Sequence, residues 1–320
     1  MGDKIVKTES ASLPASRVGE TDIVRAFLAG RNERTQRAYQ ADLDNFSTWL
    51  GVPDAAKAAA YLFSCGLGEA NRTVLSYRAE LVERGLSNST INRRLAAIRS
   101  MVKLARTLGV VPWTLEIPSL RGEPCRDTRG PGVANVRAIL GNLKDRKDPK
   151  GIRDVAIIRL LYDLGLRRGE VTALDVEDMD LEAGTLDVMG KGRTQKETLT
   201  IPEATRAALA DWMGVHGESS GPLFYNFNRS QKGARSRITG TGFYLVVRAL
   251  GEKMGIKNLR PHGFRHTSIT EACKRAQAAG ISLEEVMEFS RHKDIRTLMV
   301  YRDREKNRHG EIANLVAAGV

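Results

Sequence analysis

The sequence has few cysteines: Cys65, Cys125 and Cys273 are the only three in 320 residues, and no two of them form a CxxC pair. Disulfide frameworks and structural zinc sites require thiols paired at short spacings, so this set disfavours both. A sparse, odd number of cysteines is typical of a reducing cytosol. We therefore predict a protein without a bound metal ion and without disulfides.

Long apolar runs are also missing. No run approaches the ~20 residues that a transmembrane helix needs. The first ten residues, MGDKIVKTES, lack the apolar stretch of a signal peptide. We therefore expect a cytoplasmic protein without a membrane span. The 320 residues, 42% of them hydrophobic and 28% charged, are enough for two globular domains.

Charge is strongly unbalanced: 50 Lys and Arg stand against 38 Asp and Glu, which gives a net charge of +12. A basic balance of this size favours an anionic partner, either nucleic acid or an anionic membrane surface.

The first third of the sequence is predicted to be helical after a flexible polar tail, residues 1–17. Apolar residues recur at helical spacing, and Asn, Asp, Ser and Gly mark the helix ends. Helical patterning begins near Asp22, and the further predicted helices are Arg34–Leu50, Asp54–Phe63, Asn71–Arg84 and a helix that begins after Ser87 and ends near Leu108.

The last of these helices carries two different stripes. Residues 71–106 contain eight Arg or Lys against two Glu, a surplus of six that is half of the net charge of the chain. This surplus is compatible with a solvated basic face, but it favours a face that follows DNA phosphates. The apolar stripe is Ile91, Leu95, Ile98, Val102 and Ala105, and the candidate DNA contacts are Arg93, Arg94, Arg99 and Lys103.

Residues 110–129 contain three prolines and no helical stripe, so we interpret them as a linker with a domain boundary near Cys125. Helices are expected at 133–143, at 152–164 and again from Pro202. Between them lie three short β-compatible pieces, 175–179, 185–189 and 197–201, with Gly190-Lys191-Gly192 as the turn between the last two. The predicted fold is mainly α with a small antiparallel β-sheet.

Arg167 and Glu170 stand three apart, where a surface ion pair is the ordinary interpretation. Alternatively, Glu170 orients the guanidinium so that its planar fork meets two phosphate oxygens. Lys191, at the tip of the predicted hairpin, is either a solvated turn residue or a protonated general acid, and Lys196 is its nearby rival.

Near the carboxyl end, His262 and Arg265 are also three apart, so a helix would place both on one face. His266 is adjacent but would point elsewhere. His292 precedes Tyr301 by nine residues. A tyrosine on an amphipathic helix usually packs in a core, but cationic neighbours can favour the phenolate and make it a nucleophile.

In this order, the motifs R-x-x-E, GKG, H-x-x-R and a later His and Tyr resemble those of the tyrosine recombinase (phage integrase) family, of the simple two-domain type. Thr90-Ile91-Asn92-Arg93-Arg94-Leu95 also resembles the amino-terminal domain of that family. One departure is that the family usually has glycine before the second histidine, where this sequence has Arg291.

The resemblance implies an all-helical, SAM-like core-binding domain at 18–120 and an α+β catalytic domain at 126–320. It implies strand exchange through a 3′-phosphotyrosine on double-stranded DNA with a specific recombination site, without a cofactor and without a membrane partner. The implied enzyme is a homotetramer on two DNA sites, cytoplasmic and nucleoid-associated, from a bacterium, a phage or another mobile element. The implied catalytic residues are Arg167, Lys191, His262, Arg265, His292 and Tyr301, with Glu170 as an orienting residue.

Three other functions remain open at this point. A catalytically silent DNA-binding protein would share the basic surface, and a type IB topoisomerase would share the covalent tyrosine. An RNA-binding helical protein is favoured by charge alone, without an aromatic stacking motif.

Overall fold

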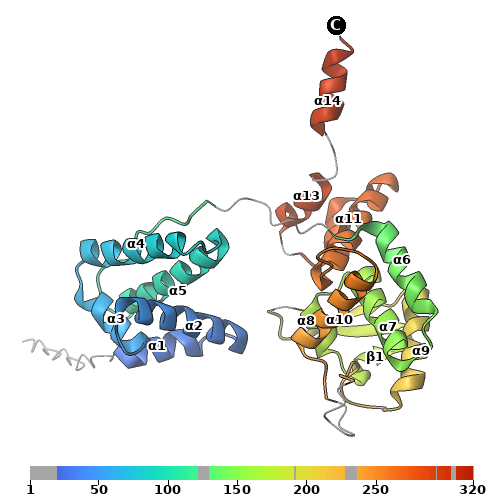
Figure 1. Ribbon diagram of the computed structural model, residues 1–320, viewed down its shortest axis with the longest axis horizontal. Helices are drawn as coiled ribbons and strands as arrows, with labels where there is room; N and C mark the ends of the chain where they lie inside the picture. Colours follow the sequence, from blue (N-terminus) through green and yellow to red (C-terminus); the bar gives the residue numbers. More distant parts are fainter. Residues whose placement is uncertain are drawn as a thin grey trace, which may run out of the picture. The chain divides into compact units, whose positions relative to one another are not determined.

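The computed structural model describes residues 20–121, 130–190, 192–227, 236–292, 294–303 and 308–319. The chain divides into two compact units, residues 1–126 and 127–320 (Figure 1). Each unit has its own cluster of buried hydrophobic side chains. Cys125, near which the domain boundary was predicted, lies outside the described residues.

The described part of the amino-terminal unit is all-helical, as predicted (Figure 1). Asn32, Asp54 and Ser87 cap three of its helices by accepting a hydrogen bond from a backbone N–H of the first turn. The helices are α1 (Glu20–Ala29), α2 (Glu33–Leu50), α3 (Ala55–Ser64), α4 (Leu67–Glu83) and α5 (Asn88–Thr107).

Helix α5 packs against α1, α2 and α4. All five residues of its predicted apolar stripe are buried. The described segment after α5, residues 108–121, has neither helix nor strand, yet it is not a free linker. Val111, Leu115 and Ile117 are buried in the amino-terminal core, and Asn92 exchanges hydrogen bonds with Leu120. The linker predicted from residue 110 is therefore fastened to α5 at least as far as Leu120.

The carboxyl-terminal unit combines helices with one small sheet. Its largest core cluster lies around α7, which contacts α6, α8, α9 and α11. The helices are α6 (Gly132–Lys144), α7 (Pro149–Asp163), α8 (Arg168–Ala173), the 3₁₀ helix η1 (Val176–Asp178), α9 (Glu203–His216), α10 (Gly240–Lys253), α11 (Pro261–Ala278), α12 (Leu283–Ser290), α13 (Ile295–Asp303) and α14 (Arg308–Ala317).

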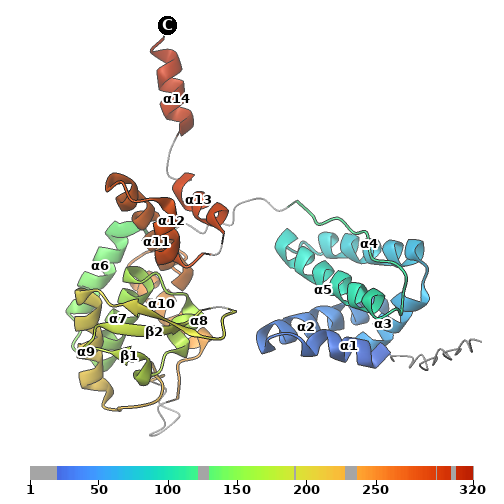
Figure 2. The same ribbon diagram turned by 180° about the vertical axis from the view of Figure 1, so that it is seen from behind.

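Three antiparallel strands form the sheet in the order β1 (Met179–Asp180), β2 (Thr185–Met189) and β3 (Lys196–Thr200). Met189 pairs with Lys196, and β2 also contacts α8 (Figure 2). The first predicted strand, 175–179, was wrong over most of its length. The Asp178 carboxylate accepts a hydrogen bond from the Asp175 backbone N–H and closes a 3₁₀ turn there, so β1 begins only at Met179.

Candidate active site

Arg167 lies at the amino-terminal end of α8, where its position is set by Glu170. One Glu170 oxygen accepts from the Arg167 backbone N–H at 2.8 Å, and the other accepts from the Arg167 Nη1 at 2.7 Å. The Glu170 side chain is 3% exposed and that of Arg167 is 30% exposed. Glu170 therefore holds Arg167 from inside the protein, while part of the guanidinium reaches solvent.

Arg265 lies in the first turns of α11, which begins with a proline, a residue suited to the first position of a helix. Its side chain is buried. Nη1 donates to the Gly165 carbonyl and Nη2 to the Ser290 carbonyl, and Nη2 is also 3.4 Å from His292 Nε2. Arg265 thereby joins the segment before Arg167 to the end of α12. Burial, followed by the charges of Arg167 and Arg291, lowers the pKa of Arg265 to about 10, so it stays protonated at neutral pH.

His292 follows the end of α12 and is partly buried. Burial is the main cause that lowers its pKa to about 4, and the positive charge of Arg265 is the next. The imidazole is therefore neutral at pH 7 and keeps one donor and one acceptor nitrogen.

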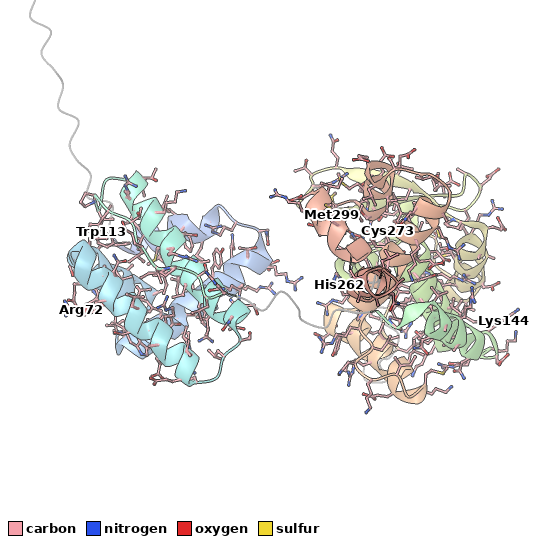
Figure 3. The ribbon with its side chains drawn as sticks, turned by 90° about the horizontal axis from the view of Figure 1, so that it is seen from above. Arg72, Trp113, Lys144, His262, Cys273 and Met299 are labelled. Atoms are coloured by element: carbon pink, nitrogen blue, oxygen red, sulfur yellow. The ribbon has the colours of Figure 1, made fainter. Side chains whose placement is uncertain are left out.

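Tyr301 lies on α13 and is 8% exposed. Its ring packs with Ile269, Cys273 and Leu298, between α11 and α13 (Figure 3, where Cys273 and Met299 mark these helices). The ring centroid is also 5.7 Å from that of His292. The two interpretations of Tyr301 therefore coexist: the side chain packs in a small core, and the same ring lies against a predicted active-site histidine.

His266 also lies beside Tyr301, with ring centroids 4.7 Å apart. The expectation that His266 points away from the site missed this contact. His266, Ile269 and Cys273 lie three and four residues apart, so they share the face of α11 that meets α13. That spacing in the sequence was the signal from which a shared face for His266, Ile269 and Cys273 could have been predicted.

His262 lies on the first turn of α11 (Figure 3) and is exposed. Partial burial, then the charges of Arg265 and Arg167, lower the pKa of His262. These charges act on both histidines, which indicates that the positive groups surround one region.

Lys191 lies outside the described residues. The flanking strands β2 and β3 are paired up to Met189 and Lys196, so the two strands of the predicted hairpin are confirmed. Lys196, the rival, forms an ion pair with the Asp178 carboxylate. The hydrogen bond within this pair, from the Lys196 ammonium to Asp178, is the main cause that raises the Lys196 pKa.

Arg291 adds a third guanidinium to this region. Its Nη2 donates to Glu170 at 2.7 Å, and both side chains are at most 4% exposed. Glu170 thus pairs with two guanidiniums, those of Arg167 and Arg291, and its charge also acts on the buried Arg265. Within the described part of the chain, four buried nitrogens here have no hydrogen-bond partner: Arg265 Nε, Arg291 Nε, Arg291 Nη1 and His292 Nδ1. Buried donors of this kind favour a bound anion.

The candidate DNA contacts on α5 largely serve internal contacts. Arg93 forms an ion pair with Asp42, and Arg94 donates to the Asn45 side chain. Arg99 donates to the Ile117 carbonyl at 2.8 Å and to Ser119 Oγ at 3.2 Å. Lys103 is exposed. The four residues therefore differ in how free they are to meet a phosphate.

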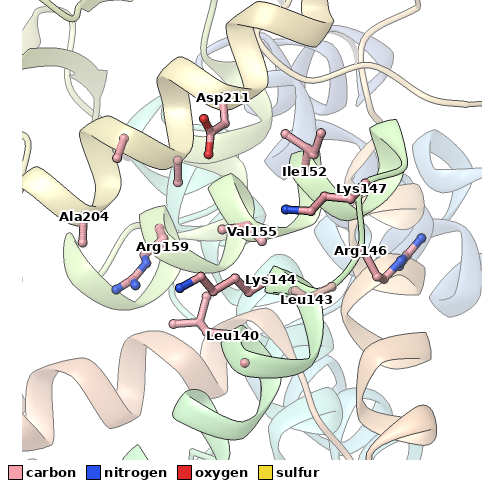
Figure 4. Close-up of a pocket in the computed structure, with 13 residues that line it drawn as sticks. Leu140, Leu143, Lys144, Arg146, Lys147, Ile152, Val155, Arg159, Ala204 and Asp211 are labelled. Carbon is pink, nitrogen blue, oxygen red and sulfur yellow. The ribbon is translucent and has the colours of Figure 1, made fainter.

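A separate cavity of about 670 Å³ lies between α6, α7 and α9 (Figure 4). Apolar residues, including Leu140 and Val155, meet Lys144, Lys147 and Arg159 around it. None of the predicted catalytic residues lines this cavity, so we assign it no part in the chemistry. Over the described ranges, no group of His, Cys, Asp or Glu side chains is arranged to hold a metal ion, and no helix could cross a membrane.

Comparison with known proteins matches both units. Residues 133–308 match the phage integrase family, and residues 26–107 match the phage integrase N-terminal SAM-like domain. A tyrosine recombinase of Synechocystis is 35% identical over 90% of this chain and 91% of that protein. A tyrosine recombinase of Synechococcus elongatus is 35% identical over 99% of each chain.

Solved structures share the fold at low sequence identity. The XerH site-specific recombinase, in a post-cleavage complex with a palindromic substrate, matches with a TM-score of 0.65 at 15% identity, over 97% of this chain and 98% of that one. A lambda integrase dimer bound to a core site matches with a TM-score of 0.65 at 14% identity, over 90% of this chain and 95% of that one. Because the family match spans more than half of the chain and the relatives exceed 30% identity over nearly all of it, the chain belongs to the phage integrase family, the tyrosine recombinases, which are site-specific DNA strand transferases.

Proposed function

We propose that Tyr301 is the nucleophile with which this recombinase cuts and rejoins DNA. The Tyr301 Oη gives up its proton and attacks a scissile phosphodiester, so that a P–Oη bond forms while the bond from phosphorus to the 5′-oxygen breaks and the 5′-oxygen takes up a proton. The products are a 3′-phosphotyrosine and a free 5′-hydroxyl. The reverse attack by a 5′-hydroxyl of the partner strand releases the tyrosine, so one ester replaces another and no energy-supplying cofactor is required.

Arg167 and Arg265 stabilise the negative charge that builds on the non-bridging oxygens in the transition state, and His292 donates a further hydrogen bond. Removal of one such preorganised donor typically slows an enzyme by about 10²–10³-fold. The guanidinium of Arg265 is held by two carbonyls that compete weakly with a phosphate, because they carry no full charge. Its charge therefore remains available to the substrate.

Lys191 supplies the proton that the departing 5′-oxygen needs, since an ammonium group is protonated at neutral pH. His262, exposed beside Arg265, hydrogen-bonds the phosphate and assists proton movement. The lowered pKa of His262 keeps it largely neutral at pH 7, which suits a group that both accepts and donates a proton.

One observation carries this proposal: Arg265, His292 and Tyr301 come from three separate elements and are linked by direct contacts, and Arg265 also contacts the segment just before Arg167. Arg265 contacts both the Gly165 segment and His292, and the His292 ring stacks near the Tyr301 ring. Basic residues that served only solubility would not share one buried carboxylate, as Arg167 and Arg291 share Glu170.

We further propose that the enzyme acts as a homotetramer on two copies of a specific double-stranded DNA site in the bacterial cytoplasm. Leu315 and Val316 of α14 are 74% and 67% exposed. Apolar side chains of this size on a short terminal helix are suited to docking on a neighbouring protomer. The membership in a family of DNA strand transferases supports the DNA partner.

Tyr301→Phe tests the nucleophile. Because the DNA site is unidentified, the native chain and the variant are incubated with sheared genomic DNA of the source organism, denatured in detergent, and recovered with any covalently attached DNA for sequencing. The native chain should retain a discrete set of DNA ends, and Tyr301→Phe should retain none while its DNA affinity stays within a few-fold.

Tyr244→Phe on α10 is the matched control, because it removes one phenol oxygen from the same unit and should leave the adduct intact. An adduct that persists in Tyr301→Phe would overturn the assignment of the nucleophile. Relaxation of a supercoiled plasmid that lacks the recovered site would instead indicate a type IB topoisomerase.

A further inference from the structure

Arg291 occupies a backbone position that suits glycine. It ends α12 with φ 53° and ψ 36°, in the left-handed region. Among the described residues, Asn258 is the only other non-glycine residue with positive φ. A side chain at such a position costs roughly 1 kcal/mol relative to glycine. The strain indicates that the Arg291 side chain contributes something that glycine cannot.

The Arg291 side chain is also buried, at 4% exposure, where a guanidinium loses its hydration. Burial lowers the pKa of Arg291, whereas the charge of Glu170 raises it. Strain and burial of charge tend to persist together at functional sites, where neighbouring contacts enforce them. Here the enforcing contact is the ion pair with Glu170, a residue 121 positions away in the sequence.

Glu170 is shared between two arginines. Its Oε1 accepts from Arg167 Nη1, and its Oε2 accepts from both the Arg167 backbone N–H and Arg291 Nη2. Arg291 therefore ties α8, which positions Arg167, to the end of α12, which positions His292. It also divides the single negative charge of Glu170 between two guanidiniums, so Arg167 is less fully neutralised.

We propose that Arg291 is a positioning residue for DNA cleavage, which acts through Glu170 to fix Arg167 and to leave its charge available for the scissile phosphate. The proposal rests on the function proposed above. It makes a specific claim about this chain: glycine at position 291 would relieve the backbone and impair the chemistry.

The test compares single-turnover formation of the covalent adduct, on a nicked duplex that carries the recovered site, with the Kd for the same duplex. Arg291→Gly should slow adduct formation about 10–100-fold, the loss expected for one to two charge-assisted hydrogen bonds, with Kd changed less than three-fold. Arg291→Lys should recover part of the rate, because the ammonium keeps the charge but loses the fork. Asn258→Gly, which relieves the other positive-φ residue, should leave the rate unchanged.

A double-mutant cycle separates positioning from a structural role. If Arg291 acts through Glu170, Arg291→Gly should slow the reaction less than three-fold in a Glu170→Gln background. Additive losses in rate, or a rate for Arg291→Gly equal to that of the native chain, would overturn the proposal while leaving the nucleophile assignment intact. Failure of the native chain to form any adduct would overturn both.

Discussion

Both units of the chain contain a buried carboxylate shared by two arginines, but the surroundings of the two carboxylates differ. In the amino-terminal unit, Asp42 is 2% exposed, and its partners Arg93 and Arg94 are 44% and 17% exposed. In the catalytic unit the partners of Glu170 are Arg167, at 30%, and Arg291, at 4%. A third cation, Arg265, is buried beside them without a carboxylate of its own.

The difference shows how one pairing serves two purposes. Around Asp42, Arg93 lies close to solvent, and the charges of both arginines hold helices α2 and α5 together. In the candidate active site, two cations, Arg265 and Arg291, are almost completely withdrawn from water, and the three cations outnumber the carboxylate. Burial of unbalanced charge is costly unless an opposite charge arrives. The fold therefore holds an excess of buried positive charge, which an anion such as a phosphodiester would neutralise.

The largest expected effect is that of Arg265→Ala, which removes one of these buried positive charges. This variant should slow adduct formation by about 10²–10³-fold, because it removes a preorganised donor to the transition state. DNA affinity should fall only a few-fold. The measurement is the single-turnover rate beside Kd on the same duplex.

Arg275→Ala serves as the control, because it removes an exposed guanidinium from the far end of the same helix, where it pairs with Glu271. Equal losses of rate and affinity in Arg265→Ala would reduce Arg265 to an ordinary phosphate contact.

The next effect concerns the amino-terminal carboxylate. Replacing both Arg93 and Arg94 by Met should lower the free energy of unfolding of that unit by about 3 kcal/mol, since a buried Asp42 would lose both cations. Arg72→Met removes an exposed pair with Glu69 and should cost less than about 0.5 kcal/mol. Urea unfolding followed by far-UV circular dichroism measures both. An unchanged midpoint for the double variant would show that the Asp42 cluster does not stabilise the unit.

A smaller, pH-dependent effect tests the lowered pKa of His292. The pKa of His292 is lowered from 6.5 to about 4, so the folded chain binds fewer protons at this site than the unfolded chain between these values. His292 therefore contributes to a loss of stability as the pH falls from 6.5 to about 4. In NMR titrations, its ring resonance should move with a midpoint near pH 4, and Arg265→Ala should raise that midpoint. A midpoint near 6.5 in the native chain would contradict the burial of this ring beside positive charge.

Local patterns in the sequence predicted the family, the fold class, the buried stripe of α5 and the hairpin between β2 and β3. All of these depend on spacings of a few residues or on an ordered motif. The prediction of the first strand was wrong because the Asp178 carboxylate accepts a hydrogen bond from the Asp175 backbone N–H and closes a turn. A period-two pattern does not distinguish such a turn from a strand.

The contacts that organise the site are of another kind. Glu170 and Arg291 are 121 residues apart, and Asp42 and Arg93 are 51 apart. No periodicity predicts such pairs, because they form only when the helices pack. Arg291 was visible in the sequence as a departure from the family's usual glycine, but its backbone conformation and its carboxylate partner required the structure. The catalytic and DNA-binding roles of individual residues remain predictions.

The smallest expected effect separates the two kinds of basic residue on α5. Lys103 is exposed, whereas Arg99 is engaged with the Ile117 carbonyl and Ser119. If Lys103 meets a phosphate, Lys103→Ala should weaken binding a few-fold for all DNA sequences. It should also reduce the slope of log K against log salt by about 1, because one fewer counterion is released. Arg99→Ala should instead lower the unfolding midpoint of the amino-terminal unit and leave the slope nearly constant. Fluorescence anisotropy over a series of salt concentrations measures the slope, with Lys57→Ala on α3 as the control for an exposed lysine elsewhere on the unit. A slope that falls for Arg99→Ala and not for Lys103→Ala would reverse the assignment and show that an arginine fastened in the free protein is released to bind DNA.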